Sequence, residues 1–232
     1  MKNIKLAKIN AARRALDFIK DGMVIGLGSG STVNIFIKEL SNFVKEKQYI
    51  VSVVPSSYDV EILAIKYGLR ISTLNENPMP DIAVDGADVV DPELNLLKGG
   101  GGALTREKIV DYSSKKLIII VDESKLKESI FVKPVPVETL PFSWRSVVEK
   151  ILASYDCSIE LRMCGKGKVG PVVTDNGNFI LDVYFKDKQH LPSEVNVNLK
   201  LIPGIVETGI FSNKFVDAVI VGYENKVEIL TR

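Results

Sequence analysis

Hydrophobic and polar positions follow two different rhythms in the first half of the chain. Short runs of consecutive hydrophobic residues are separated by segments in which hydrophobic residues recur every three or four positions. Runs of the first kind are typical of buried strands, and segments of the second kind are typical of amphipathic helices. We expect strands at residues 23–27, 49–54, 69–74, 81–84 and 116–121, and helices at residues 1–20, 33–40, 57–66 and 104–112.

Strands that alternate with helices in this way predict an α/β fold with a mostly parallel, Rossmann-like sheet and helices on both faces. Ligand sites in such sheets lie at the C-terminal ends of the strands. Three glycine- or aspartate-rich segments follow predicted strands directly, namely residues 26–32, 85–88 and 122–125. We therefore expect these three segments to meet in one crevice.

The pattern changes after about residue 130. Strands are expected at residues 132–137, 157–163, 170–174, 179–185 and 205–210, and helices at residues 143–154 and 192–201. The prolines of the first of these strands suit an edge position. The order approximates β-α-β-β-α-β, which is typical of a small α+β, ferredoxin-like unit.

Two further short apolar strands, at residues 218–222 and 227–230, are expected to return to the first sheet. The sequence thus predicts two domains. Residues 1–130 together with 211–232 would form a large α/β catalytic domain, and residues 131–210 would form the small α+β domain.

Composition narrows the classes of function. The net charge of the 232 residues is +1, which argues against a partner as acidic as nucleic acid or an anionic membrane. No apolar run reaches membrane-spanning length. The two cysteines, Cys157 and Cys164, are too few for a disulfide framework and match no common zinc pattern. We expect a cytoplasmic protein with reduced thiols, in which the single histidine, His190, is a surface loop residue.

The segment Gly26-Leu-Gly-Ser-Gly-Ser-Thr32 joins a predicted strand to a predicted helix. Backbone N–H groups at a helix N-terminus favour a phosphate, and Ser29, Ser31 and Thr32 add hydroxyl donors. The segment is neither a dinucleotide fingerprint, because Ser31 replaces the third glycine, nor a P-loop. The alternative interpretation is a tight turn in which a hydroxyl caps the helix.

Candidate acid–base groups are concentrated between residues 85 and 108. Asp85 and Asp88 end a predicted strand, and two carboxylates there could bind sugar hydroxyls and pass protons. Lys98 stands beside Gly99–Gly102, and a cation next to bare amides suits a developing oxyanion. The alternative for each is structural: an aspartate turn, a flexible loop, and a surface salt-bridge face around Glu107.

Taken together, the motifs resemble those of type A ribose-5-phosphate isomerase. Gly-Leu-Gly-Ser-Gly-Ser-Thr, Asp-Gly-Ala-Asp, Lys-Gly-Gly-Gly-Gly-Ala-Leu-Thr-Arg-Glu-Lys and Asp-Glu-Ser-Lys occur in that order. Residues 173–178, Val-Thr-Asp-Asn-Gly-Asn, and 202–211 resemble later segments of the same family. The resemblance spans nearly the whole chain.

The resemblance implies an aldose-ketose isomerase that interconverts ribose 5-phosphate and ribulose 5-phosphate, in the pentose phosphate pathway, without a metal ion or organic cofactor. Glu107 would be the base that moves a proton between C2 and C1 through an enediolate. Asp85, Asp88 and Lys98 would assist ring opening, position hydroxyls and stabilise the oxyanion. Substrate-binding residues would be Ser29, Gly30, Ser31, Thr32, Gly86, Ala87, Gly99, Gly100, Gly101, Lys125 and Lys8. The resemblance also implies a homodimer or homotetramer.

Two departures and two rival interpretations remain at this point. Val89 stands where the family often has an acid, and residues 164–170 fit its pattern poorly. A sugar-phosphate sensor of similar fold would need a DNA-binding module before the first strand, where only one helix is predicted. An amino-sugar-phosphate deaminase would need an active-site histidine, and an acyl-CoA transferase-like protein is the other related enzyme.

Overall fold

The computed structural model describes residues 3–165 and 167–232 and divides the chain into two compact units. Unit 1 comprises Met1–Ala87, Arg106–Lys125 and Lys214–Arg232. Unit 2 comprises Asp88–Thr105 and Leu126–Asn213. The expected helix at residues 1–20 is present as α1 (Ile4–Ala15), while Met1, Lys2 and Lys166 lie outside the described residues.

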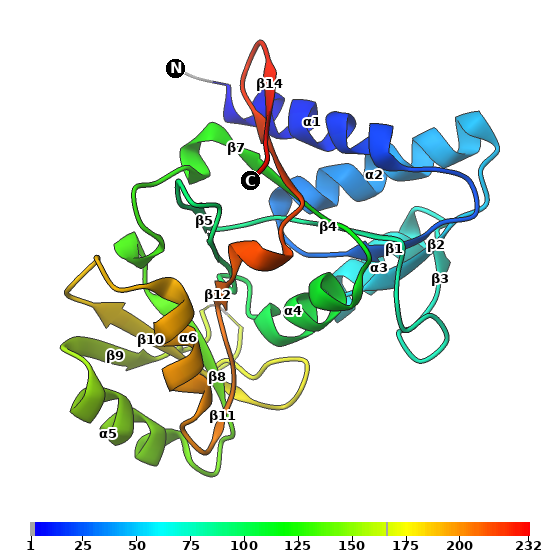
Figure 1. Cartoon of the computed structure of the whole chain (residues 1–232). Coiled ribbons are helices and arrows are strands. Elements are labelled where there is room, and N and C mark those ends of the chain that lie inside the picture. Colours follow the sequence, from blue (N-terminus) through cyan, green and yellow to red (C-terminus); the bar gives the residue numbers. More distant parts are fainter. Residues whose placement is uncertain (1–2, 166) are drawn as a thin grey trace. The chain divides into compact units, whose positions relative to one another are not determined.

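Unit 1 is built on a seven-stranded sheet with the order β14-β13-β7-β4-β1-β2-β3 (Figure 1). Neighbouring strands pair parallel, except that β14 pairs antiparallel with β13. The strands are β1 (Val24–Leu27), β2 (Ser52–Pro55), β3 (Arg70–Ile71), β4 (Ile82–Asp85), β7 (Leu117–Asp122), β13 (Ala218–Gly222) and β14 (Val227–Leu230). The predicted parallel sheet and the return of the last two strands to it are confirmed.

Successive side chains along each strand point to opposite faces of this sheet, so both faces carry side chains that need cover, and helices cover both. Ile25 and Leu27 of β1 belong to the core cluster that α1 and α2 (Ser31–Lys47) also enter. Gly26 faces the other way, toward Val110 of α4 (Leu104–Ser113). The remaining helix, α3 (Tyr58–Lys66), follows β2 and contacts it.

The central strand β7 shows why the hydrophobic pattern predicted this sheet. All six residues from Leu117 to Asp122 are buried. A parallel strand covered on both faces has no solvent side, so its sequence is a continuous apolar run instead of an alternation.

Unit 2 contains a four-stranded antiparallel sheet with the order β11-β8-β10-β9. Its strands are β8 (Val135–Thr139), β9 (Cys157–Leu161), β10 (Phe179–Phe185) and β11 (Ile205–Thr208), and its helices are α5 (Trp144–Ser154) and α6 (Pro192–Lys200). The chain order β8-α5-β9-β10-α6-β11 is the β-α-β-β-α-β order expected from the sequence. The ferredoxin-like topology is therefore confirmed.

A second, three-stranded sheet of unit 2 was missed by the sequence reading. It has the order β12-β6-β5, formed by β5 (Val89–Val90), β6 (Leu96–Leu97) and β12 (Ile210–Phe211). Because β6 pairs with β12, the segment Asp88–Thr105 groups with unit 2 and not, as expected, with the large α/β domain. The units therefore differ from the expected division at residues 88–105, 126–130 and 211–213.

Three smaller expectations were also wrong. Strand β8 lies inside its sheet and not at an edge; Pro136 fits there because it packs against Gly209, just beyond the end of β11. Residues 170–174 form only an isolated bridge between Met163 and Pro171. The strand expected at residues 69–74 is limited to the two residues of β3.

Short 3₁₀ turns complete the described secondary structure. They are Leu16–Phe18, Glu123–Lys125, Ile130–Val132 and Asn213–Phe215. Among the described helices, none is long and apolar enough to cross a membrane.

Asp81 joins the N-terminal ends of two central strands and supports a prediction about pH. Its carboxylate accepts hydrogen bonds from Lys115 Nζ (2.7 Å) and from Val24 N (2.9 Å), and the Lys115 contact lowers the pKa of Asp81 below its usual value. A carboxyl whose pKa is lowered on folding stabilises the fold above its unfolded pKa and loses that contribution as the pH falls through its folded pKa.

We expect Asp81→Asn to lower the free energy of unfolding by about 1 kcal/mol at pH 7, and the difference from wild type to shrink as the pH falls below about 4. Urea unfolding at several pH values measures this. Glu46→Gln, at an exposed position of α2, is the control. A difference that stays constant down to pH 3 would contradict the assignment.

Candidate active site

The site in unit 1 is built around the buried carboxylate of Asp85 at the end of β4. Asp85 Oδ1 accepts hydrogen bonds from Ser29 N (3.0 Å) and Gly86 N (2.6 Å). Gly28 N donates to Val84 O (3.0 Å), so the loop after β1 stays attached to β4. A β-carbon at Gly28 would lie 1.8 Å from Cγ and Oδ1 of Asp85, so only glycine allows this approach.

Glu107 lies beside this carboxylate's loop, in the first turn of α4. Ser29 Oγ donates to Glu107 Oε1 at 2.5 Å, and the Glu107 residue is 3% exposed. The helix can approach because Gly26 has no side chain: a β-carbon there would lie 2.6 Å from Val110 Cγ1. Ser29 is thus held by Asp85 through its backbone and holds Glu107 through its hydroxyl.

In unit 1, Lys8 lies at the N-terminus of α2. Lys8 Nζ donates to Ser31 Oγ at 2.9 Å. Helix α2 begins at Ser31 after Gly30, whose φ of +100° favours glycine, and Thr32 is buried in its first turn. A lysine next to the first amides of a helix is suited to bind an anion.

In unit 2, the short β5–β6 hairpin brings Asp88 and Lys98 together. Its antiparallel register pairs Val89 with Leu97, so residues 88 and 98 lie opposite each other at its open end. Lys98 is 2% exposed, its backbone N donates to Gly209 O (2.9 Å), and its Nζ lies 5.4 Å from the centroid of the Phe211 ring.

The glycine run is a turn that supports Asp88. Gly102 N donates to Gly99 O (3.0 Å), and φ is +97° at Gly99 and +84° at Gly102. Gly100 N donates to Asp88 Oδ2 at 2.9 Å, and a β-carbon at Gly100 would lie 2.9 Å from that same oxygen. The structure thus brings Gly99, Gly100 and Asp88 together, a contact that was not predicted.

Two further predicted residues follow the ends of strands β4 and β7. Gly86 follows Asp85 directly, and a β-carbon on it would lie 3.4 Å from Ser29 O. Lys125 ends the 3₁₀ turn after β7, three residues beyond Asp122. The roles of all the predicted site residues in catalysis and substrate binding, those of Lys125, Ala87 and Gly101 included, stay predictions.

A buried acidic residue of unit 2, Glu138 on β8, was not predicted from the sequence. Its carboxylate is fully buried and accepts side-chain hydrogen bonds from Thr105 (2.5 Å), Thr174 (2.9 Å), Asn178 (2.8 Å) and Asn176 (3.1 Å). Thr105 is the last residue of unit 2 before α4 continues into unit 1, two positions before Glu107. Only the motif at residues 173–178 gave a signal for this network.

His190 and the cysteines lie apart from these groups. The His190 ring packs against Phe185, Tyr155 and Phe131, with centroids 5.5, 5.7 and 5.8 Å away, so it is half-buried and not the surface residue expected. Cys157 and Cys164 are not disulfide-bonded, and burial raises the pKa of Cys157. Within residues 3–165 and 167–232, no three His, Cys, Asp or Glu side chains are grouped to hold a metal ion.

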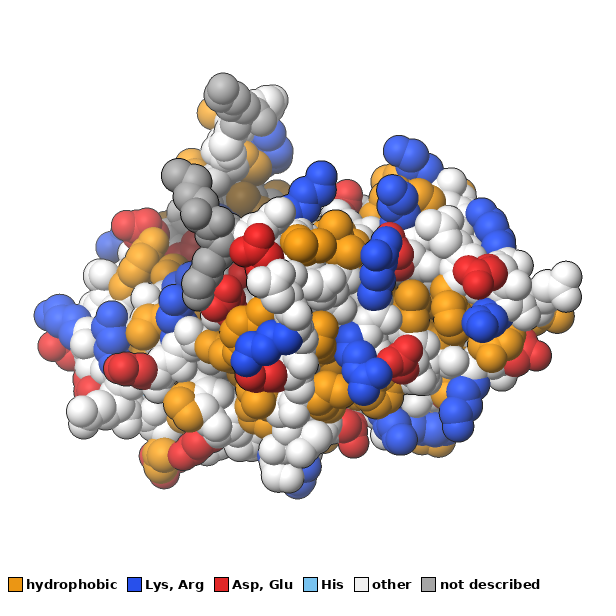
Figure 2. Space-filling model, turned by 90° about the horizontal axis from the view of Figure 1, so that it is seen from above, with side chains coloured by type: hydrophobic (Ala, Val, Ile, Leu, Met, Phe, Trp, Pro, Cys, Tyr) orange, Lys and Arg blue, Asp and Glu red, His pale blue; other side chains and the backbone are white. Residues whose placement is uncertain are grey.

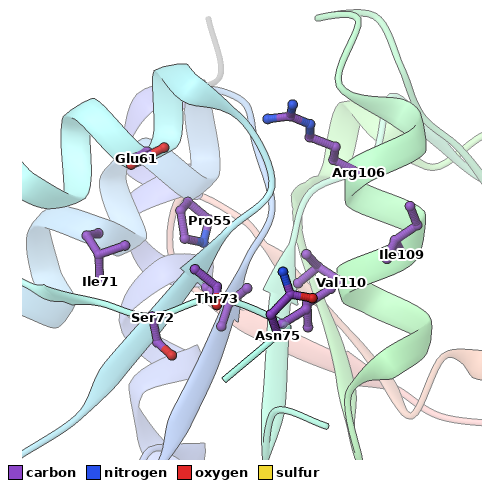
Figure 3. Close-up of a pocket in the computed structure, with 11 residues that line it drawn as sticks. Pro55, Glu61, Ile71, Ser72, Thr73, Asn75, Arg106, Ile109 and Val110 are labelled. Atoms are coloured by element: carbon purple, nitrogen blue, oxygen red, sulfur yellow. The ribbon is translucent and has the colours of Figure 1, made fainter. Parts of the chain in front are cut away.

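A cavity of about 390 Å³ lies in unit 1 between α4 and the C-terminal ends of β2 and β3 (Figure 3). Arg106, Ile109 and Val110 line it from α4, while Pro55 and Ile71 line it from the ends of β2 and β3. The Arg106 guanidinium carbon lies 4.7 Å from the centroid of the Tyr58 ring. Neither Ser29, Asp85 nor Glu107 lines this cavity.

Fold and site define a class: an α/β protein with buried carboxylates and a helix N-terminus suited to an anion, at the C-terminal ends of parallel strands. The comparisons with known proteins agree. Residues 52–226 match the model of the family described as ribose 5-phosphate isomerase A (phosphoriboisomerase A).

Similar proteins cover the chain almost completely. The ribose-5-phosphate isomerase A of Methanococcus aeolicus is 50% identical over 97% of this chain and 94% of its own length. The solved structure of ribose 5-phosphate isomerase A from Methanocaldococcus jannaschii is 41% identical, with a TM-score of 0.93 over 98% of this chain and 99% of its own. A D-ribose-5-phosphate isomerase in complex with phospho-erythronic acid is 45% identical, with a TM-score of 0.94 over 99% of this chain and 100% of its own. This chain belongs to the ribose 5-phosphate isomerase A family.

The contact between Gly28 and Asp85 supports a prediction about steric fit. We expect Gly28→Ala to lower the free energy of unfolding by about 1–3 kcal/mol, because the new methyl group must displace the Asp85 side chain. Gly101→Ala is the control, since a β-carbon there has no neighbour within 4 Å; its effect should stay below about 1 kcal/mol. Denaturant unfolding compares the two, and equal effects would show that the contact at Gly28 is not restrictive.

Proposed function

We propose that this chain interconverts ribose 5-phosphate and ribulose 5-phosphate, as an aldose-ketose isomerase of the non-oxidative pentose phosphate pathway. The observation that carries the proposal is the buried Glu107 carboxylate, held by Ser29 next to Asp85, in a chain of this family. The ligand of the solved relative, phospho-erythronic acid, is a four-carbon sugar-acid phosphate. A ligand of this kind supports a small sugar phosphate as the substrate.

Glu107 would act as the general base. Its carboxylate takes the proton from C2 of the open-chain aldose, and the electron pair moves through C1 onto the carbonyl oxygen. The resulting enediolate becomes the ketose when a proton moves from the C2 hydroxyl to the C1 oxygen and the base returns its proton to C1. A well-placed general base contributes about 10²–10⁴-fold to such a step.

Three further residues would serve this reaction. Asp85 and Asp88 would open the furanose ring and position hydroxyls, and Lys98 would stabilise the oxyanion of the enediolate. Lys98 is suited to this role because a buried cation acts more strongly on a developing charge than a solvated one.

The phosphate would bind where Lys8 meets the N-terminus of α2. The Lys8–Ser31 contact and the first amides of the helix support this assignment. Other substrate contacts would come from Ser29, Gly30, Thr32, Gly86, Ala87, Gly99, Gly100, Gly101 and Lys125.

We propose that the enzyme needs no metal ion or organic cofactor, acts in the cytoplasm and assembles as a homodimer or homotetramer. We also propose that it binds neither nucleic acid nor membranes. The net charge of +1 supports the absence of a nucleic-acid partner. On the face shown in Figure 2, basic and acidic side chains are interspersed with hydrophobic ones and form no single-sign patch.

The test is conversion of ribose 5-phosphate to ribulose 5-phosphate in EDTA, comparing wild type with Glu107→Gln. The amide keeps the size of the side chain and an oxygen for the Ser29 hydroxyl, but it is not a base. We expect kcat to fall by about 10²–10⁴-fold while the unfolding midpoint changes little. Glu149→Gln, exposed on α5, is the matched control.

Each contrary result has a defined meaning. Full activity of Glu107→Gln would contradict the role of Glu107 as the base, but the assignment as an isomerase would stand. Wild-type protein that binds the sugar phosphate but does not turn it over would contradict the enzyme assignment, and turnover that EDTA abolishes would contradict the metal-free mechanism.

A further inference from the structure

An ion pair in unit 2 has no role in the reaction proposed above. Arg162 follows β9, and Asp182 lies on the neighbouring strand β10. The guanidinium donates to the carboxylate twice, from Nε to Oδ2 at 2.8 Å and from Nη2 to Oδ1 at 2.5 Å. The side chains are only 17% and 14% exposed. Such a bidentate pair fixes the plane of the guanidinium as well as its position.

The remaining nitrogen of this guanidinium holds the glycine run. Arg162 Nη1 donates to Gly99 O at 2.7 Å and lies 3.3 Å from Gly100 O. Glycine residues have more backbone freedom than any other residue, so a glycine run keeps one conformation only when other groups hold it. Asp182 thus orients Arg162, and Arg162 in turn orients the backbone of Gly99 and Gly100.

One peptide unit carries this orientation to Asp88. The carbonyl of Gly99 and the N–H of Gly100 belong to the same planar group, and in a trans peptide they point in opposite directions. The described chain contains no cis peptide bond. Arg162 therefore binds one edge of this unit while the other edge donates to Asp88 Oδ2 at 2.9 Å.

We propose that Arg162, held by Asp182, is a positioning residue for the Asp88 carboxylate and acts through the Gly99–Gly100 peptide unit. The proposal rests on the function above, in which Asp88 contacts the substrate. The effect is one of geometry, because the Asp182 carboxylate balances the charge of the guanidinium. Rotation of the Gly99–Gly100 peptide group would turn the Gly100 N–H away from Asp88. Displacement of a carboxylate by about 1 Å can lower the rate by up to about 10²-fold.

The test is a double-mutant cycle between Arg162→Lys and Asp88→Asn. Lysine keeps the charge, but it cannot bind Asp182 with two hydrogen bonds and reach a carbonyl as well. We expect Arg162→Lys to lower kcat by about 10-fold in the wild-type background and by less than about 2-fold in the Asp88→Asn background. Arg145→Lys, at an exposed ion pair of α5 in the same unit, should leave kcat unchanged.

A spectroscopic measurement is independent of turnover. In protein labelled with ¹⁵N-glycine, the Gly100 amide resonance should shift in both Arg162→Lys and Asp88→Asn, and stay in place in Arg145→Lys. Asp182→Asn, which weakens the pair without removing the guanidinium, should shift it in the same direction. These variants are compared at temperatures where each remains folded by circular dichroism.

The outcomes separate this proposal from the proposed function. Equal losses from Arg162→Lys in both backgrounds, or an unmoved Gly100 resonance, would overturn the positioning role and leave Asp88 in place. Undiminished kcat in Asp88→Asn would remove the role given to Asp88 above, and the positioning role would fall with it. Strong coupling between the two sites together with a shifted resonance would support the proposal.

Discussion

The buried carboxylate of Asp85 is the contact on which the unit 1 site depends. It accepts the backbone N–H groups of Ser29 and Gly86, and so it fastens the loop after β1 to the end of β4. With its backbone fixed in this way, Ser29 can direct its hydroxyl at Glu107. These two backbone hydrogen bonds offset part of the cost of burying the Asp85 carboxylate.

The same device occurs twice. In unit 1 a carboxylate, Asp85, binds a backbone N–H of the loop beside Gly28; in unit 2, Asp88 binds the N–H of Gly100. In both places a β-carbon on the glycine would collide with the carboxylate. Gly28 and Gly100 thus serve a packing function, because they let two charged side chains approach the backbone closely.

The larger elements of the fold could be predicted from the sequence because they follow periodicity. The apolar run that became β7 and the strand–helix alternation around it depend on local pattern and burial alone. The hairpin β5–β6 could not be predicted in this way, because two-residue strands leave no periodic signal. Their pairing with β12, more than one hundred residues away, also moved the boundary of the units.

The site was predictable to a similar degree. Motif order led to the prediction that Asp85, Asp88, Lys98 and Glu107 are site residues, but the roles proposed for them are not visible in residue types. The supporting residues were missed because their partners are distant in sequence: Glu138 accepts a hydrogen bond from Thr105, 33 positions away, and Arg162 donates one to Gly99, 63 positions away. Only a three-dimensional structure shows that such residues share hydrogen bonds.

The central claim is that Glu107 is held where it can reach the reacting carbons of the sugar. A crystal structure of the Glu107→Gln variant soaked with ribose 5-phosphate tests it most directly, since slow turnover would leave the substrate in place. We expect the side chain at position 107 to lie within about 3–3.5 Å of C1 and C2, with its oxygen still accepting the hydrogen bond from the Ser29 hydroxyl. A substrate whose C1 and C2 lie within reach of Asp85 or Asp88, and beyond reach of position 107, would contradict it.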